Sequence, residues 1–84
     1  MSTKVILSAV EAQKGGVNVN IKRFISGELC SEQNTSIPYR ELFDGFVPGT
    51  SIEEALYYVY ILDEQINCHL ELEDFEFEIH CPAD

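Results

Sequence analysis

Apolar and polar residues alternate near the start of the chain in a way that predicts a β-hairpin. Residues 4–12 are mostly β-branched or apolar, which is typical of a strand. Val17, Val19 and Ile21 then alternate with polar residues, so a second strand should bury one face and expose the other. Gly15–Gly16 lies between the two segments and can supply the positive φ values of a tight turn. We therefore expect two antiparallel strands in this region.

The alternation changes phase at residues 23–25, which predicts either a β-bulge or the end of the strand. Ser26-Gly27 follows as a second turn, and a short third strand is expected around residues 28–30. Residues 31–36 are polar and rich in turn-forming residues, so this segment predicts a loop.

Two helices are predicted in the middle of the chain. A short one covers residues 38–43, with Pro38 near its start and Gly45 just past its end. Ser51 and Glu54 fit a capping box, in which a hydroxyl and a glutamate satisfy free backbone amides at the start of a helix. A main helix is expected from about Glu53 to Ile66, ending at Asn67. Its buried stripe should consist of Ile52, Ala55, Leu56, Val59, Leu62 and Ile66.

The last segment, residues 69–81, alternates like a strand but changes phase at Glu73-Asp74. Apolar residues occupy even positions before that point and odd positions after it, so we expect one bulged strand or two short ones. The predicted order is β-β-(β)-α-α-β(β). It indicates an α+β domain, residues 1–84, in which an antiparallel sheet of about three to five strands packs on one main helix plus a short helix.

Length and composition support one small folded domain. The chain has 84 residues, of which 45% are apolar, enough for a core. No apolar run approaches the ~20 residues needed to cross a bilayer, and the first residues lack the features of a signal peptide. The expected location is therefore the cytoplasm. Because the three cysteines are an odd number without a secretory signal, we expect reduced thiols and no disulfide.

Charge is distributed very unevenly along the chain. The formal net charge is -10, yet all five lysines and arginines fall within the first forty residues, which carry a net charge of +2. From Glu41 onward there are twelve acidic residues and no lysine or arginine, a net charge of -12. Such a field repels nucleic acid and anionic membranes and attracts basic proteins. We expect a basic protein partner, in particular a nucleic-acid-binding protein or complex, and neither direct nucleic-acid binding nor membrane binding.

The acidic residues near the end of the chain are the first candidate binding site. On a strand, Glu76 and Glu78 would project from one side with His80, at steps of roughly 6.6 Å. Such a row has a spacing of the same order as phosphates along a nucleic-acid strand. The alternative is a solvated edge strand whose charge prevents aggregation. The candidate acidic residues are Asp63, Glu64, Glu71, Glu73, Asp74, Glu76 and Glu78.

Tyr57, Tyr58 and Tyr60 are the second candidate contact residues. Together they leave the main helix apolar on most sides, which favours two packing partners. One is the sheet, and the other is a target protein or a second protomer in a homodimer. The alternative is a well-covered core helix whose tyrosine hydroxyls reach solvent.

Metal binding and catalysis find little support in the sequence. Cys68-His69 and His80-Cys81 suggest zinc, but neighbouring residues on a strand point to opposite faces and Cys-x-x-Cys spacing is absent. A mixed site such as Cys68 with His80 is the remaining arrangement. No nucleophile elbow, phosphate-binding glycine loop or metalloprotease helix is present. We expect no enzyme activity, no catalytic residue, no metal and no cofactor.

In size, charge and α+β organisation the chain resembles the small acidic inhibitors encoded by phages and mobile elements, among them anti-CRISPR, anti-restriction and uracil-DNA glycosylase inhibitor proteins. The resemblance rests on length and on the acidic run from Glu71 to Glu78. It implies a protein that occludes a positively charged nucleic-acid-binding surface, partly by imitating phosphates, in the host cytoplasm. The alternatives are an immunity or antitoxin-type protein that neutralises a basic toxin, and a structural homo-oligomeric subunit.

Overall fold

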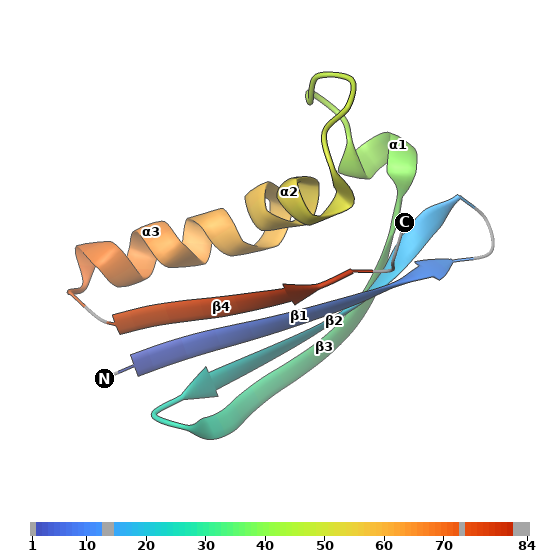
Figure 1. The fold of residues 1–84 in the computed structure, drawn as a ribbon. Coiled ribbons are helices and arrows are strands. Elements are labelled where there is room, and N and C mark those ends of the chain that lie inside the picture. The colour runs from blue at the N-terminus through green and yellow to red at the C-terminus, as the bar shows by residue number, and fades with distance from the viewer. Residues whose placement is uncertain (1, 13–14, 73, 82–84) are drawn as a thin grey trace.

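A computed structural model describes residues 2–12, 15–72 and 74–81 of the protein. Four strands form one sheet, and the helical elements lie on one side of it (Figure 1). The elements in chain order are β1 (Ser2–Ala12), β2 (Gly16–Ile25), β3 (Glu28–Pro38), α1 (Tyr39–Leu42), α2 (Ile52–Leu56), a π-helical turn η1 (Tyr57–Ile61), α3 (Leu62–Leu70) and β4 (Asp74–His80). The predicted α+β class, with one main helix and one short helix, is confirmed.

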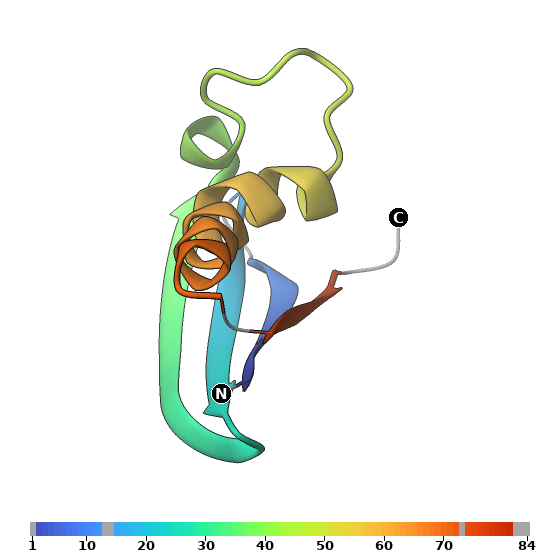
Figure 2. The same ribbon diagram turned by 90° about the vertical axis from the view of Figure 1, so that its left-hand side faces the viewer.

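The strands are ordered β3-β2-β1-β4 across the sheet. β1, β2 and β3 form antiparallel pairs, whereas β4 pairs with β1 in parallel. The parallel pairing arises because the long helix carries the chain back along the sheet between β3 and β4 (Figure 1). Viewed along the helix, the molecule has two layers, and the other face of the sheet is open within the described residues (Figure 2).

The turn between β2 and β3 follows the sequence prediction. Ser26 and Gly27 both have positive φ values, 52° and 84°, as a two-residue hairpin turn that matches strand twist requires. The register is irregular at the predicted place, because Arg23 pairs with Ser31 while Phe24 pairs with Leu29. The extra residue, Cys30, belongs to β3, so the prediction of a bulge in the second strand itself was wrong.

The predicted loop at residues 31–36 is wrong, because this segment belongs to the long edge strand β3. Most of its polar side chains are exposed, and those of Glu32, Asn34 and Ser36 form hydrogen bonds with side chains of β2. The Asn20 side-chain amide donates to Asn34 at 2.9 Å, and the Ser36 hydroxyl donates to Asn18 at 2.7 Å. These contacts satisfy polar groups that local sequence alone assigned to a turn.

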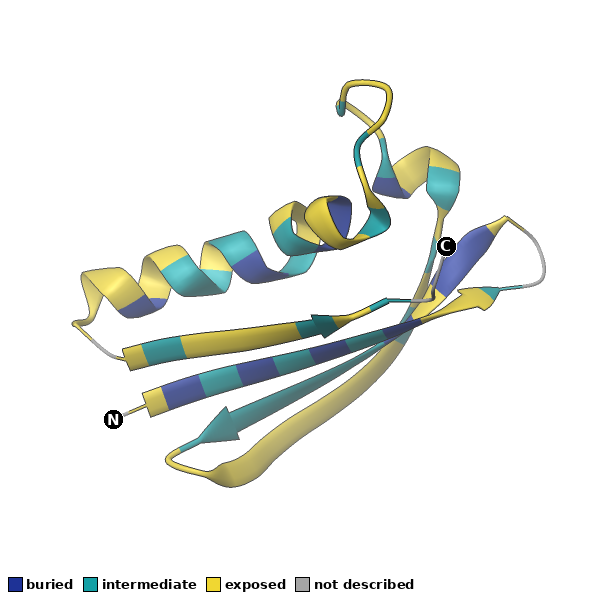
Figure 3. Cartoon of the chain, in the orientation of Figure 1, coloured by how far each residue is buried: buried dark blue, intermediate teal, exposed yellow. Residues whose placement is uncertain are grey.

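The core lies between the long helix and the central strands. β1 and β2 bury alternate apolar positions beneath the helix, and Figure 3 shows the repeating pattern along β1. Leu42 of α1 closes one end of this core. The largest fully buried side chains are all aliphatic and carry no polar atoms: Val5, Leu7, Val17, Val19, Leu42, Leu56 and Ile61.

The main helix begins as predicted and ends later than predicted. The Ser51 hydroxyl accepts a hydrogen bond from the Glu54 backbone amide at 3.1 Å, which caps α2. At the other end the helix continues past Asn67 to Leu70, because the Asn67 carbonyl accepts a further backbone bond from Glu71. Both predictions for residues 69–81, one bulged strand or two short strands, are therefore wrong. The phase change separates the end of α3 from a single strand, β4.

A π-helical turn shifts the buried face of the long helix. Leu56 and Ile61 are both 0% exposed although they lie five residues apart, whereas an α-helix repeats its face every three or four residues. Val59 and Ile66, which the sequence placed in the buried stripe, are 40% and 48% exposed. That part of the predicted stripe is wrong, because the extra residue in the turn rotates the following helix.

This phase shift can be tested by truncation. We expect Ile61→Ala to lower the free energy of unfolding by about 2–5 kcal/mol, because it leaves a cavity in the core. Val59→Ala should cost about 1 kcal/mol or less, since Val59 is partly solvated. Urea denaturation of both variants measures the difference. An uninterrupted α-helix predicts a loss at Val59 as large as the loss at Ile61.

Candidate functional site

The pleat of β4 separates two kinds of side chain. Asp74, Glu76 and Glu78 project to the open face of the sheet, and we call these three residues the β4 carboxylate row. Phe75 and Ile79 project to the other face and pack against the core beneath the helix. Glu73 lies outside the described residues. The structure thus brings three of the five terminal candidate acids to one edge of the sheet.

The last member of the row already has a partner within the chain. Glu78 forms an ion pair with Lys4 of β1, in which Oε2 lies 2.8 Å from the Lys4 Nζ atom. Its other carboxylate oxygen, Oε1, lies 3.5 Å from Nε2 of His80. The hydrogen bond and positive charge of Lys4 lower the pKa of Glu78. The same contact raises the pKa of Lys4. Within the described residues Asp74 and Glu76 form no ion pair, although Glu76 lies opposite Lys4 in the strand register and its charge contributes to the raised pKa of Lys4.

The candidate acids on the helix take different positions. Asp63 is exposed on the outer side of α3, and Glu71 is exposed just beyond its end. Glu64 turns toward the sheet and pairs with Arg23 of β2. Of these three, only Asp63 and Glu71 therefore add to the exposed negative surface.

The three tyrosines do not form a ring around the helix. Tyr57 packs its ring against Phe77 of β4 at a centroid distance of 5.2 Å, and its hydroxyl donates to Gln65. Tyr58 is 49% exposed and contacts Phe46. Tyr60 is partly buried against the core, and this burial raises the pKa of its hydroxyl. Only Tyr58 presents much of its ring to solvent.

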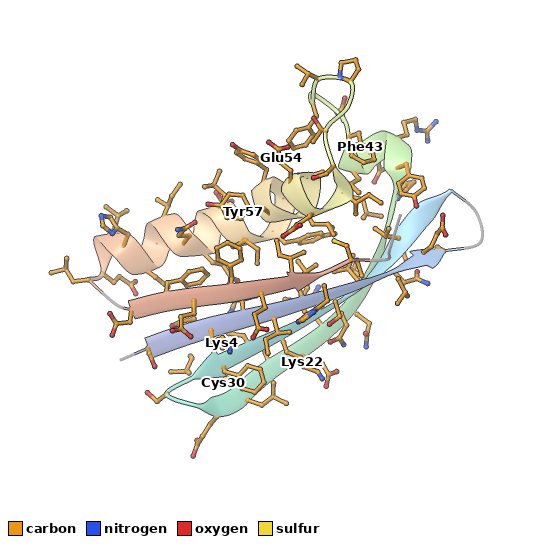
Figure 4. The ribbon with its side chains drawn as sticks, in the orientation of Figure 1. Lys4, Lys22, Cys30, Phe43, Glu54 and Tyr57 are labelled. Atoms are coloured by element: carbon orange, nitrogen blue, oxygen red, sulfur yellow. The ribbon has the colours of Figure 1, made fainter. Side chains whose placement is uncertain are left out.

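A groove between the start of the long helix and β4 was not found by sequence reasoning. It has a volume of about 370 Å³ and is lined by Ser51, Glu53, Glu54, Tyr57, Phe77 and Ile79. Figure 4 labels Glu54 and Tyr57, which both come from the helix. The only feature of the sequence that pointed to this groove was the alternation that places Phe77 and Ile79 on one face of a strand. This alternation does not show which helical residues lie opposite them.

The cysteines and histidines are dispersed. Cys68 is buried on α3 with His69 exposed beside it, and His80 and Cys81 lie at the end of β4. Across residues 2–12, 15–72 and 74–81, no group of three or more histidine, cysteine or acidic side chains is arranged to hold a metal ion.

In the same ranges no helix has the length and apolar character that crossing a membrane requires.

The Lys4–Glu78 pair gives a testable pH dependence. Because Lys4 lowers the pKa of Glu78, the pair stabilises the fold above the ordinary glutamate pKa, and this contribution is lost as the pH falls through the lowered value. We expect Lys4→Gln to raise the pKa of Glu78 toward its ordinary value, as followed by NMR of its carboxyl carbon. Lys22→Gln, two strands away, is the matched control and should leave it unchanged (Figure 4).

Comparisons with protein-family models, with curated proteins and with solved structures find no match to this chain.

Proposed function

We propose that the protein is an acidic inhibitor that occupies a positively charged, nucleic-acid-binding surface of another protein. One observation carries this proposal: the β4 carboxylate row lies on an edge strand, and β4 and the long helix contain no lysine or arginine. The described basic residues lie elsewhere, with Lys4 on β1, Lys22 and Arg23 on β2, and Arg40 on α1. Negative charge is therefore concentrated on β4 and the long helix, where Lys4 and Arg23 each pair with one acid, Glu78 and Glu64.

The mechanism is steric and electrostatic occlusion. Long-range attraction orients the acidic side toward a basic surface and speeds encounter. At contact, Asp74 and Glu76 pair with lysine or arginine side chains that otherwise hold phosphates. Two exposed aromatic rings, Phe77 on β4 and Tyr58 on the long helix, supply apolar contact that charge alone does not provide.

Charge reversal tests this function. We expect Asp74→Lys combined with Glu76→Lys to weaken capture of the target by at least about tenfold, because two attractive pairs become repulsive. The measurement is a pull-down from bacterial lysate with identification of captured proteins by mass spectrometry. Competing DNA and raised salt should displace the wild-type target, since salt shortens the screening length from about 10 Å at 0.1 M to about 3 Å at 1 M.

The matched control for this reversal is Glu28→Lys combined with Glu41→Lys. It changes the net charge equally at exposed positions on β3 and α1, away from β4. The control should retain the target, and both variants should keep the circular dichroism of the native fold. Equal loss in the two double variants would mean that net charge, and not the β4 carboxylate row, governs binding. Capture of proteins that do not bind nucleic acid would contradict the inhibitor function.

An immunity or antitoxin-type protein would use the same surface against a basic toxin, and the identity of the captured protein separates it from the phage-type inhibitor.

A homo-oligomeric subunit is the second candidate, because Tyr58, Val59 and Ile66 leave apolar surface on the outside of the long helix. Sedimentation of the purified protein distinguishes it. A stable oligomer that Val59→Asp dissociates supports the subunit, and a monomer contradicts it.

A further inference from the structure

The groove beside β4 combines an aromatic floor with a strand edge that pairs with no other strand in the part of the chain that the structure describes. Phe77 projects toward the helix, yet it is 39% exposed because the helix leaves the outer side of β4 uncovered (Figure 2). Its ring contacts Tyr57, and Ile79 lies along the same floor. An apolar floor that remains half-solvated in the folded chain gains free energy when a partner covers it.

Tyr57 extends this surface along the helix. Its hydrogen bond to Gln65, two turns further on, holds the ring in place beside Phe77. A second hollow of about 390 Å³ begins on the other side of Tyr57 and is lined in part by Leu62, Ile66 and Leu70. The apolar surface is therefore longer than one side chain, which suits an extended occupant.

The edge of β4 offers backbone groups to the same occupant. Within the described residues β4 pairs only with β1, so alternate residues of its outer edge direct amide and carbonyl groups away from the sheet. An extended segment can pair there as a fifth strand. Its side chains then alternate between the groove on the helix face and the β4 carboxylate row on the open face.

Charge determines what kind of segment fits. Glu53 and Glu54 border the groove on the helix face, Asp74 and Glu76 border the edge on the open face, and no lysine or arginine lines the groove. A second copy of β4 would bring like charges together and is disfavoured. A guanidinium suits both features, since it stacks on aromatic rings and pairs with carboxylates through parallel hydrogen bonds.

We propose that β4 and the groove beside it bind an extended, arginine-containing segment of the partner as a fifth strand, with one arginine side chain on the Tyr57–Phe77 floor between Glu53 and Glu54. This inference rests on the proposed function and names the part of the basic partner that is recognised. Arginine on the groove face contacts the floor and these two carboxylates. Basic residues on the other face of the segment contact Asp74 and Glu76.

A short peptide tests this binding mode without the natural partner. The probe is an acetylated, amidated peptide of seven residues, the length of β4, in which threonine and valine alternate around a central arginine. Calorimetry measures its affinity, and backbone NMR locates it. We expect binding that shifts the amides of Phe77 and Ile79. Citrulline in place of arginine should weaken binding by about tenfold, because it removes the charge and keeps the shape.

Two further controls separate the groove and the strand edge from net charge. Glu53→Gln combined with Glu54→Gln should weaken the peptide by about tenfold, whereas Glu28→Gln combined with Glu41→Gln should not. A peptide N-methylated at every threonine and valine cannot pair as a strand and should not bind. Equal weakening by both double variants, or binding of the methylated peptide, would overturn the proposal.

The two proposals fail in different ways. If charge reversal on β4 abolishes capture of the natural target but the peptide does not bind, the inhibitor function stands and this binding mode is wrong. If the peptide binds as expected and no nucleic-acid-binding protein is captured, the binding mode stands and the inhibitor function is wrong.

Discussion

Packing of Leu56 and Ile61 against the central strands holds this small domain together. Both side chains are fully buried, and the π-helical turn between them lets two residues five positions apart face the same sheet. Val59 in this turn and Ile66 in α3 are therefore exposed, whereas Cys68 of α3 is buried. Because the same helix carries the chain back along the sheet, its packing also decides where β4 enters the sheet.

The position of β4 has two consequences for the surface. β4 is an edge strand, and its pleat directs carboxylates to the open face and apolar residues toward the helix. Because β4 pairs with β1, Glu78 lies beside Lys4, and this ion pair compensates the charge of one carboxylate of the row. Asp74 and Glu76 carry negative charge on the open face, whereas Glu53 and Glu54 carry it at the start of the helix, beside the floor formed by Tyr57 and Phe77.

The two edges of the sheet have different chemical character. β3 carries mainly uncharged polar side chains, several of them bonded to asparagines of β2. β4 carries an acid at every second position until His80. Acid at regular intervals discourages pairing between copies of β4 and permits pairing with a basic strand. The proposed binding mode and the protection of the edge thus depend on the same residues.

The sequence by itself determined the features that depend on neighbouring residues. The alternation of Val17, Val19 and Ile21, the turn at Ser26-Gly27 and the cap at Ser51 all appear where the pattern predicted them. The side of β4 on which Glu76 and Glu78 project follows from alternation in the same way, because the pleat is a local property of an extended chain.

Only the tertiary structure decided the features that depend on distant residues. The polar segment 31–36 became a strand because β2 offered it partners, and the π-helical turn formed where two core contacts had to share one sheet face. Likewise, the Lys4–Glu78 pair and the contact of Tyr57 with Phe77 join residues that are not neighbours in the sequence. The periodicity of apolar residues indicates which side chains are buried, but it does not show which distant residues they contact. The groove beside β4 could therefore be recognised only in the folded structure.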